Sequence, residues 1–237
     1  MRSAIAFLTV LPVAAADGAP GERLGRPFFP VVGMLLGLLA WVALTAGTLL
    51  AGPLVGAVAA LAVLALLTGG LHLDGLADCA DGLLMTADRE RRLEVMRDPR
   101  LGTFGVLALV LILLGGMTAL ARIGPMAGLA ALLTAGALSR LAMLAVLIGL
   151  PYQRPVGLGV AAAGGGRADL ALGALLAAPV FLLDWRHALL AAALAAVATA
   201  GVAALARARI GGATGDVYGA TCELAQLSAL VAFAVRW

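Results

Sequence analysis

The sequence predicts an all-α integral membrane protein: about seven transmembrane helices in one bundle, with an N-terminal short amphipathic or re-entrant helix. The first reason is composition, because 63% of the 237 residues are hydrophobic and the mean hydropathy is +1.07, whereas a soluble domain is about 45–50% apolar. The second is that seven apolar stretches follow one another along the chain. The third is that hydrocarbon forces backbone polar groups to pair within each segment, as helices do. With no internal repeat evident, residues 1–237 form a single polytopic membrane domain.

The seven stretches differ in how well they fit a bilayer, which takes about 20 residues per helix. Five are long enough, whereas the fifth and seventh are short and are therefore tilted, re-entrant or extended by flanking residues. The segment Ser3–Ala16 is also too short to span, and its basic start and the AAAD at 14–17 resemble a signal peptide. We expect this segment to be retained, for a reason that follows from the motifs below. The stretches are residues 31–50, 53–70, 104–122, 127–150, 170–183, 187–206 and 224–235.

Charge is distributed unevenly between the two sides of the predicted bundle. With seven spans, twelve of the sixteen arginines fall on the side of the N-terminus, three on the opposite side, and Arg140 inside a span. The positive-inside rule makes the N-terminal side cytoplasmic. All acidic residues except Asp184 fall on that side too, and because acids influence topology little, their gathering indicates an active site. We expect cytoplasmic-face active-site loops at residues 71–103, 151–169 and 207–223.

The sequence shows no sign of nucleic-acid binding or of a cysteine-based framework. No basic run or aromatic interleaving indicates that the protein binds nucleic acid. The two cysteines, Cys79 and Cys222, provide neither a disulfide framework nor a paired metal-binding motif.

Three aspartates follow the second apolar stretch, in GGLHLDGLADCADGL at 69–83. Asp74, Asp78 and Asp81 are spaced i, i+4, i+7, which places them within an arc of about 60° on one helix face. No basic residue lies between positions 72 and 88 to relieve their repulsion. Either a distant arginine folds over them, or they are protonated, or a divalent cation bridges them. Clustered carboxylates together with substrate phosphates suit Mg²⁺ or Mn²⁺, whereas the plain alternative is a solvated acidic helix face.

Two neighbouring features could complete such a site. On a continuous helix His72 points about 160° away from Asp74, so it joins the aspartates only if the helix begins after it, and Gly69-Gly70 makes such a break plausible. Downstream, RDPRLGTFG at 97–105 contains a predicted turn at Asp98-Pro99. The flanking Arg97 and Arg100 are suited to phosphate recognition.

The third constellation is the glycine-rich GGATGDVYGA at 211–220. Thr214 and Asp216 there could hold a phosphate or supply a further metal ligand, but the missing lysine excludes a Walker A loop. Arg140, in LSRLAML, lies inside a predicted span. Because an intramembrane charge is costly, it is expected to be functional or paired with an acidic residue.

These motifs occur in the order found in a known family. GGLHLDGLADCADGL, RRLEVMRDPRLGTFG and GGATGDVYGA together resemble the cobalamin synthase family, the adenosylcobinamide-GDP ribazoletransferases. AFLTVLPV at 6–13 and FFPVVGMLLG at 28–37 resemble the start of that family, which is why we expect the N-terminal segment to be retained. The family often has a second acidic residue after the last motif. Here that region reads CELAQLSAL, with Glu223 followed by Gln226.

The resemblance implies a multi-pass enzyme of the bacterial cytoplasmic (inner) membrane whose active site faces the cytoplasm. It implies a transferase that uses Mg²⁺ to join adenosylcobinamide-GDP to α-ribazole, or to α-ribazole 5′-phosphate, forming adenosylcobalamin or its 5′-phosphate and releasing GMP. Its partners are then these small molecules and membrane lipid, with no nucleic acid, and a homo-oligomer is compatible with the sequence.

This reaction suggests a role for each candidate residue. Asp74, Asp78 and Asp81 would hold Mg²⁺ on the diphosphate, and one of them or Asp98 would take the proton of the ribazole hydroxyl. The remaining candidates would contact substrate, with the arginines on phosphate and the glycine-rich turn closing the site. These substrate-binding candidates are His72, Arg97, Arg100, Arg140, Thr214 and Asp216.

Two rival functions remain to be weighed. CDP-alcohol phosphotransferases carry D-x2-D-G-x2-A-R, and residues 78–82 match its start, but Met85-Thr86 stands where Ala-Arg is expected and the later G-x3-D-x3-D is missing from this region. A cation-coupled transporter would place acids at mid-membrane and often shows repeats, whereas here the acids lie at one face.

Overall fold

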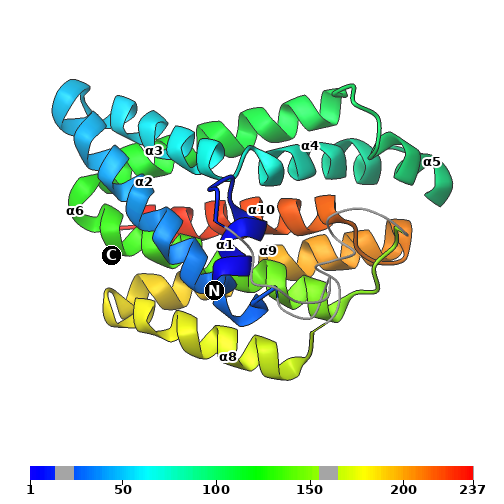
Figure 1. The fold of residues 1–237 in the computed structure, drawn as a ribbon. Coiled ribbons are helices and arrows are strands. Elements are labelled where there is room, and N and C mark those ends of the chain that lie inside the picture. The colour runs from blue at the N-terminus through cyan, green and yellow to red at the C-terminus, as the bar shows by residue number, and fades with distance from the viewer. Residues whose placement is uncertain (14–23, 155–164, 237) are drawn as a thin grey trace.

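The computed structural model describes residues 1–13, 24–154 and 165–236, and within these ranges the regular elements are helices (Figure 1). An isolated parallel bridge between Tyr152 and Ala213 accompanies them. Each of the seven predicted apolar stretches lies mostly in helix. The elements are α1 (Arg2–Leu8), η1 (Arg26–Phe28), α2 (Phe29–Ala51), α3 (Pro53–Leu67), α4 (Leu71–Leu84), α5 (Arg89–Val95), α6 (Thr103–Gly149), α8 (Arg167–Ala177), η2 (Ala178–Leu182), α9 (Trp185–Ile210) and α10 (Gly215–Ala234).

The structure supports a multi-pass membrane protein but does not confirm seven spans. Among the described residues, four helical segments are long and apolar enough to cross a bilayer, namely Arg26–Ala51, Thr103–Gly149, Trp185–Ile210 and Gly215–Ala234. A fifth is added if α3 and α4, which meet at an angle of 89°, count as one broken span. Alone, α3 with 15 residues and α8 with 11 are too short.

Helix α6 consists of two arms rather than one rod. Its 47 residues would be about 70 Å long if straight, roughly twice the thickness of the hydrocarbon. Gly124 has φ 69° and ψ −179°, a conformation open to glycine, and Pro125 after it lacks an N–H to continue the ladder. The indole N–H of Trp41 donates to the Pro125 carbonyl at 2.9 Å. The arms run in opposite directions (Figure 1) and correspond to predicted stretches 104–122 and 127–150.

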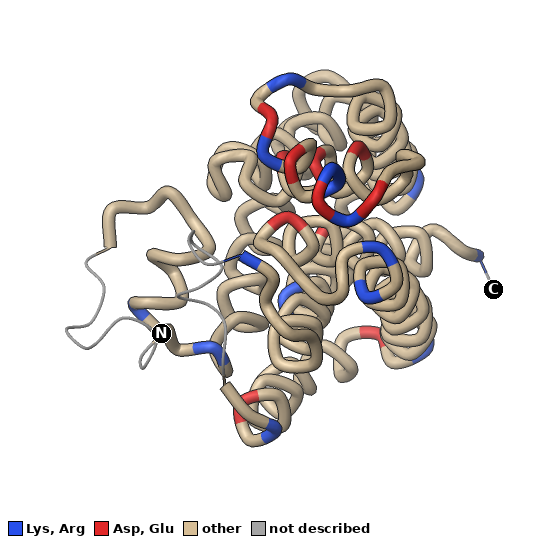
Figure 2. Tube along the Cα trace, turned by 90° about the vertical axis from the view of Figure 1, so that its right-hand side faces the viewer, with Lys and Arg blue, Asp and Glu red and all other residues tan. Residues whose placement is uncertain are grey.

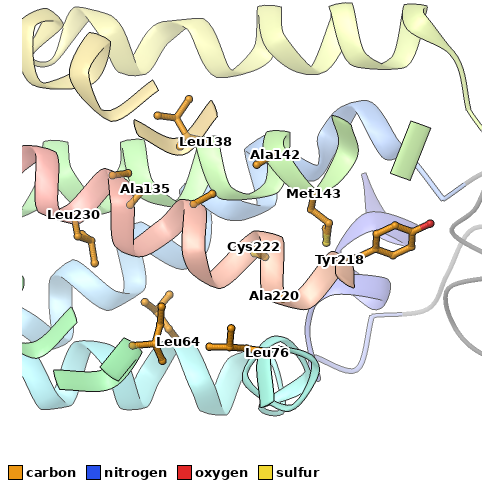
Figure 3. Packing of buried hydrophobic residues seen from close by; sticks show 14 of the residues in the cluster. Leu64, Leu76, Ala135, Leu138, Ala142, Met143, Tyr218, Ala220, Cys222 and Leu230 are labelled. Carbon is orange, nitrogen blue, oxygen red and sulfur yellow. The ribbon is translucent and has the colours of Figure 1, made fainter. Parts of the chain in front are cut away.

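Glycines set the closest helix contacts in the bundle. A Cβ added at Gly33 in α2 would lie 2.0 Å from the Gly136 carbonyl oxygen in α6, and one at Gly136 would lie 2.1 Å from that of Gly33. Such close backbone approach is how helices associate where lipid supplies no hydrophobic drive. Helix α10 packs against α4, α6 and α9, and its buried side chains run from Leu230 to Tyr218 along the core (Figure 3).

Charged residues gather at opposite ends of the bundle, as the sequence predicts. At one end, Arg122 Nε donates to the Ala234 carbonyl at 2.7 Å, and Asp184 pairs with His187. At the other end, Arg89 Nε donates to the Ile210 carbonyl at 2.9 Å. That second end holds the acidic residues of α4 and α5 together with several arginines (Figure 2).

Two of the three predicted loops prove to be largely helical. Residues 71–103 contain α4 and α5, and in 207–223 the turn between α9 and α10 is confined to Gly211–Thr214. Part of the third loop, residues 155–164, lies outside the described residues. At the N-terminus, α1 occupies only Arg2–Leu8, and residues 14–16 of the predicted entry segment also lie outside the described part of the chain.

Candidate active site

Two glycines let α4 and α10 touch at the charged end. A Cβ added at Gly75 in α4 would lie 3.0 Å from the Cα and carbonyl oxygen of Asp216, and one at Gly219 in α10 would lie 3.0 Å from the carbonyl oxygen of His72. Any larger residue at these positions would push the helices apart. The contact therefore places the aspartates of α4 beside Asp216, which belongs to a motif about 140 residues later in the chain.

Asp78 is the most strongly perturbed of the predicted aspartates. Helix α4 has 14 residues, too few to cross a bilayer by itself, so we place Asp78 outside the four spanning segments. Burial, followed by the charges of Asp216 and Asp74, raises the pKa of Asp78 to about 7. Among the described residues, no hydrogen bond reaches the carboxylate of Asp74 or that of Asp78. Asp78 therefore lies in an environment that favours a proton or a bound cation. We refer to Asp74, Asp78 and Asp216 as the acidic cluster.

Asp216 is held by Arg154, a residue that the sequence analysis did not identify. Arg154 Nη2 donates to Asp216 Oδ2 at 2.6 Å and to the Met96 carbonyl at 2.9 Å, and the Thr214 hydroxyl donates to the same Oδ2 at 3.1 Å. The sequence did place Arg154 in a loop expected on the active-site face. It could not show that the Tyr152 segment pairs through its backbone with the Ala213 turn, which brings Arg154 to Asp216.

Asp81 has a different environment from the other two aspartates of α4. Its Oδ2 accepts from the Gly102 amide at 2.8 Å and its Oδ1 accepts from the Gly105 amide at 2.9 Å. Gly102 is the N-cap of α6, so Asp81 satisfies two of the amides that begin that helix. The two glycines allow this close approach, since a Cβ at either would lie 2.4 Å from an Asp81 oxygen.

The RDPR turn lies at the surface. The backbone amide and guanidinium of Arg100 donate to Asp98, with Nη2 to Oδ2 at 2.6 Å. These hydrogen bonds hold the pKa of Asp98 below its usual range. Arg97 is exposed, so neither it nor Arg100 is committed to a buried partner.

His72 lies within α4, which begins at Leu71, so the helix does not begin after it as the conditional prediction required. The side chain still reaches the candidate site from another direction, because it is 3% exposed and lines a pocket of about 190 Å³ that Asp74 and Asp216 also line. Neither imidazole nitrogen has a hydrogen-bond partner in the described structure. The hydroxyl of Tyr218, which lines the same pocket, is likewise buried without a partner there.

Arg140 belongs to the core of the bundle. It is 1% exposed, and its Nη1 donates to Ser139 Oγ at 3.0 Å and to Gln226 Oε1 at 2.9 Å. The sequence pointed to an acidic partner. The described hydrogen bonds go to neutral groups, one of them from CELAQLSAL, while the charge of Arg140 interacts with that of Glu223 in the same segment. Arg140 is not among the residues that line the pocket containing His72.

A larger cavity lies elsewhere and lacks chemical groups suited to catalysis. It measures about 520 Å³, lies between α6, α8 and α9, and is lined by aliphatic residues apart from Thr199. Thr199 already donates to the Ala195 carbonyl at 2.6 Å. The smaller pocket beside the acidic cluster is therefore the better candidate active site.

Comparisons with known proteins find relatives that match nearly the whole chain. The sequence model of the cobalamin-5-phosphate synthase family matches residues 1–234. Among curated proteins, the chain is similar to "Adenosylcobinamide-GDP ribazoletransferase" from Pseudomonas putida, 42% identical over 98% of this chain and 97% of that protein. Proteins of the same name from Pseudomonas savastanoi pv. phaseolicola and Halorubrum lacusprofundi are 40% and 39% identical, over 98% and 100% of this chain and 97% of each.

No solved structure matches the chain. The family model matches nearly all residues, and the curated relatives are similar over 97% of their own length. These matches agree on one family. The chain belongs to the cobalamin-5-phosphate synthase family.

Proposed function

We propose that this enzyme joins adenosylcobinamide-GDP to α-ribazole, or to α-ribazole 5′-phosphate, with release of GMP, as the names of its relatives indicate. One structural observation supports the proposal most directly: carboxylates from motifs far apart in sequence share a pocket with the guanidinium of Arg154. Phosphoryl transfer needs such an arrangement, because charge spreads over the phosphoryl oxygens in the transition state and positive groups stabilise it.

In the proposed reaction, a ribose hydroxyl oxygen attacks the phosphorus that carries cobinamide. A new P–O bond forms, the anhydride P–O bond to GMP breaks and its electron pair leaves with GMP. The hydroxyl proton goes to a carboxylate of the acidic cluster. Asp98 is a poorer base, because Arg100 lowers its pKa and thereby weakens its affinity for a proton.

The acidic cluster is compatible with a bound Mg²⁺, on two carboxylates rather than on the three that the sequence analysis proposed. Among the described residues, no three His, Cys, Asp or Glu side chains form a metal site by themselves. Mg²⁺ usually takes one or two carboxylates together with substrate phosphates, and Asp74 and Asp78 are carboxylates one turn apart without hydrogen-bond partners in the described structure. A cation held there would neutralise charge on the diphosphate.

The other candidates receive supporting roles in this proposal. Arg154 has Nη2 on Asp216 and a buried Nε without a described partner, so it both orients that carboxylate and faces substrate phosphate. Thr214 fixes Asp216 from the other side. Asp81 shapes the site through α6 rather than as a ligand, since its two oxygens already accept amide hydrogen bonds.

We further propose that the charged end faces the cytoplasm of a bacterial inner membrane. The arginine distribution supports this orientation through the positive-inside rule. Arg97 and Arg100, exposed at that end, would meet the guanosine diphosphate part of a substrate arriving from water.

The test is a direct assay of the purified full-length protein in detergent. With adenosylcobinamide-GDP, α-ribazole and Mg²⁺, the wild-type protein should release GMP, and chelation of the metal should stop release. Asp78→Asn should lose at least about 100-fold in activity while it remains folded. CMP release from CDP-diacylglycerol, or vesicle uptake without chemistry, would instead favour a rival function. Near-normal turnover by D78N would refute the role of the acidic cluster.

A further inference from the structure

The pocket beside the acidic cluster contains polar atoms that nothing in the described structure satisfies. His72 is 3% exposed and Tyr218 is 4% exposed, yet both imidazole nitrogens and the phenol hydroxyl have no hydrogen-bond partner there. Buried polar groups without partners destabilise a protein. Because His72 and Tyr218 both line one pocket, their unpartnered atoms are better explained as groups that a ligand satisfies than as independent packing defects.

The walls of the pocket are aromatic and aliphatic. Phe7 from α1 and Met143 and Leu147 from α6 line it together with Tyr152. The ring of Tyr152 is stacked on that of Tyr218, with centroids 6.1 Å apart, and Met143 lies beside Tyr218 at the end of the core (Figure 3). Flat aromatic ligands favour such walls, through ring stacking and sulfur contacts.

Size and polarity select among the ring systems in the proposed reaction. A cavity of about 150 Å³ accommodates a benzene-sized ring, so about 190 Å³, open on one side, suits a small bicyclic base and not the four-ring corrin. Guanine has polar atoms around most of its edge, which aliphatic walls would leave without partners. The benzimidazole of ribazole has one free ring nitrogen and an otherwise apolar edge. Its needs match the aliphatic and aromatic walls of the pocket, where His72 and Tyr218 carry the polar atoms.

The polar mouth of the pocket suits the remainder of the same molecule. Asp74, Arg154 and Asp216 line the pocket together with the apolar residues. Asp74 is exposed, whereas His72 is buried. A nucleoside that inserts its base toward His72 would therefore leave its ribose hydroxyls beside the acidic cluster, where the reaction needs them.

We propose that this pocket binds the benzimidazole base of the nucleoside substrate, with the Tyr218 hydroxyl donating to its single free ring nitrogen and His72 as a second polar group that the bound nucleoside satisfies. We call it the base pocket. The inference rests on the proposed function for the identity of the nucleoside. It adds a specificity-determining site, distinct from the residues that act on phosphate.

Equilibrium dialysis of α-ribazole against the full-length protein tests this assignment without requiring turnover. Tyr218→Phe keeps the ring and removes only the hydroxyl, and His72→Phe keeps an aromatic side chain without nitrogens. Each should weaken α-ribazole binding about tenfold, the effect of one lost hydrogen bond in a buried site. His187→Phe is the matched control, because His187 is the other histidine of the chain and lies at the opposite end of the bundle. It should change binding by less than about twofold.

Two further readouts separate recognition from a structural role. Y218F removes a hydroxyl without a described partner, so its thermal midpoint should be no lower than that of the wild-type protein even though binding weakens. In the GMP-release assay, the KM for α-ribazole should rise while the KM for adenosylcobinamide-GDP stays within about twofold.

The outcomes distinguish this proposal from the proposed function. If α-ribazole binds and the variants weaken it, but no GMP appears, the base pocket stands and the reaction is wrong. If GMP appears while Y218F and H72F bind α-ribazole like the wild-type protein, the base pocket is refuted. It is also refuted if guanosine, rather than α-ribazole, binds and loses affinity in these variants.

Discussion

Replacing Asp81 by asparagine separates two roles that the sequence alone cannot distinguish. If Asp81 were a metal ligand, its replacement would lower activity. Its charge would also destabilise the folded protein, because it would repel the neighbouring carboxylates. As the cap of α6 it must stabilise the protein, because its oxygens accept from the Gly102 and Gly105 amides at 2.8 and 2.9 Å. In Asp81→Asn, the side-chain amide would present its own N–H₂ group to one of those donors.

The expected magnitude follows from what the substitution removes. One hydrogen bond to an ionised group is worth about 1.5–3 kcal/mol. The interaction of a negative charge with the N-terminus of a helix adds about 0.3–1 kcal/mol. D81N should therefore destabilise the N-terminal turn of α6 by about 2–4 kcal/mol, or at least about 25-fold in the local opening equilibrium.

Hydrogen exchange followed by mass spectrometry on peptides that contain Gly102–Gly105 measures this effect directly. Protection should fall in D81N and not in Asp74→Asn, the matched control, because Asp74 is exposed and its side chain makes no hydrogen bond in the described structure. D74N should instead lose activity at unchanged protection. If D81N abolished turnover while protection of α6 stayed at the wild-type level, the capping argument would be refuted and the ligand role restored.

Two other predictions follow from the same end of the bundle. Gly219→Ala would place a Cβ 3.0 Å from the His72 carbonyl, so overpacking should cost about 1–3 kcal/mol of stability and lower activity by displacing Asp216. The control is Gly201→Ala in α9, where an added Cβ meets nothing within 4 Å. It should leave GMP release unchanged and thermal stability unchanged or higher by up to about 1 kcal/mol. Equal losses in both variants would contradict the packing argument. Without Mg²⁺, the raised pKa of Asp78, about 7, means that the folded state holds a proton which the unfolded state releases near pH 4, so Asp78 lowers stability progressively as pH rises from about 4 to about 7. Thermal unfolding of wild type and D78N over this range should therefore show D78N gaining stability relative to wild type, and parallel curves would show that Asp78 is not perturbed.

Hydropathy predicts the helices well and their lengths less well. The break in α6 is visible in the sequence because Gly124-Pro125 interrupts two apolar stretches. By contrast, α10 begins nine residues before the predicted stretch 224–235. Its first turns contain glycines and polar residues that lower hydropathy, although Thr214 caps the helix by accepting from the Val217 amide. These residues allow α10 to contact α4 closely, and a hydropathy average cannot detect such a contact.

The candidate site was predictable where chemistry is local and not where it depends on tertiary contacts. Helical spacing puts Asp74 and Asp78 on one face, and both join the acidic cluster. The same spacing groups Asp81 with them, because periodicity cannot show that the start of α6 lies against that side chain. The sequence did not predict Arg154 either, because its ion pair with Asp216 depends on the backbone pairing of Tyr152 with Ala213, about 60 residues apart.

The base pocket takes its walls from the first and the last helix of the chain. Phe7 comes from α1 and Tyr218 and Gly219 from α10, and the Val10 amide anchors the N-terminal segment by donating to the Leu67 carbonyl at the end of α3. During synthesis on the ribosome, the early segments can be in place while the pocket still lacks one side. Substrate binding therefore becomes available only when α10 enters the membrane, and chains shortened at that end should be stable assemblies of helices at best, without affinity for the nucleoside.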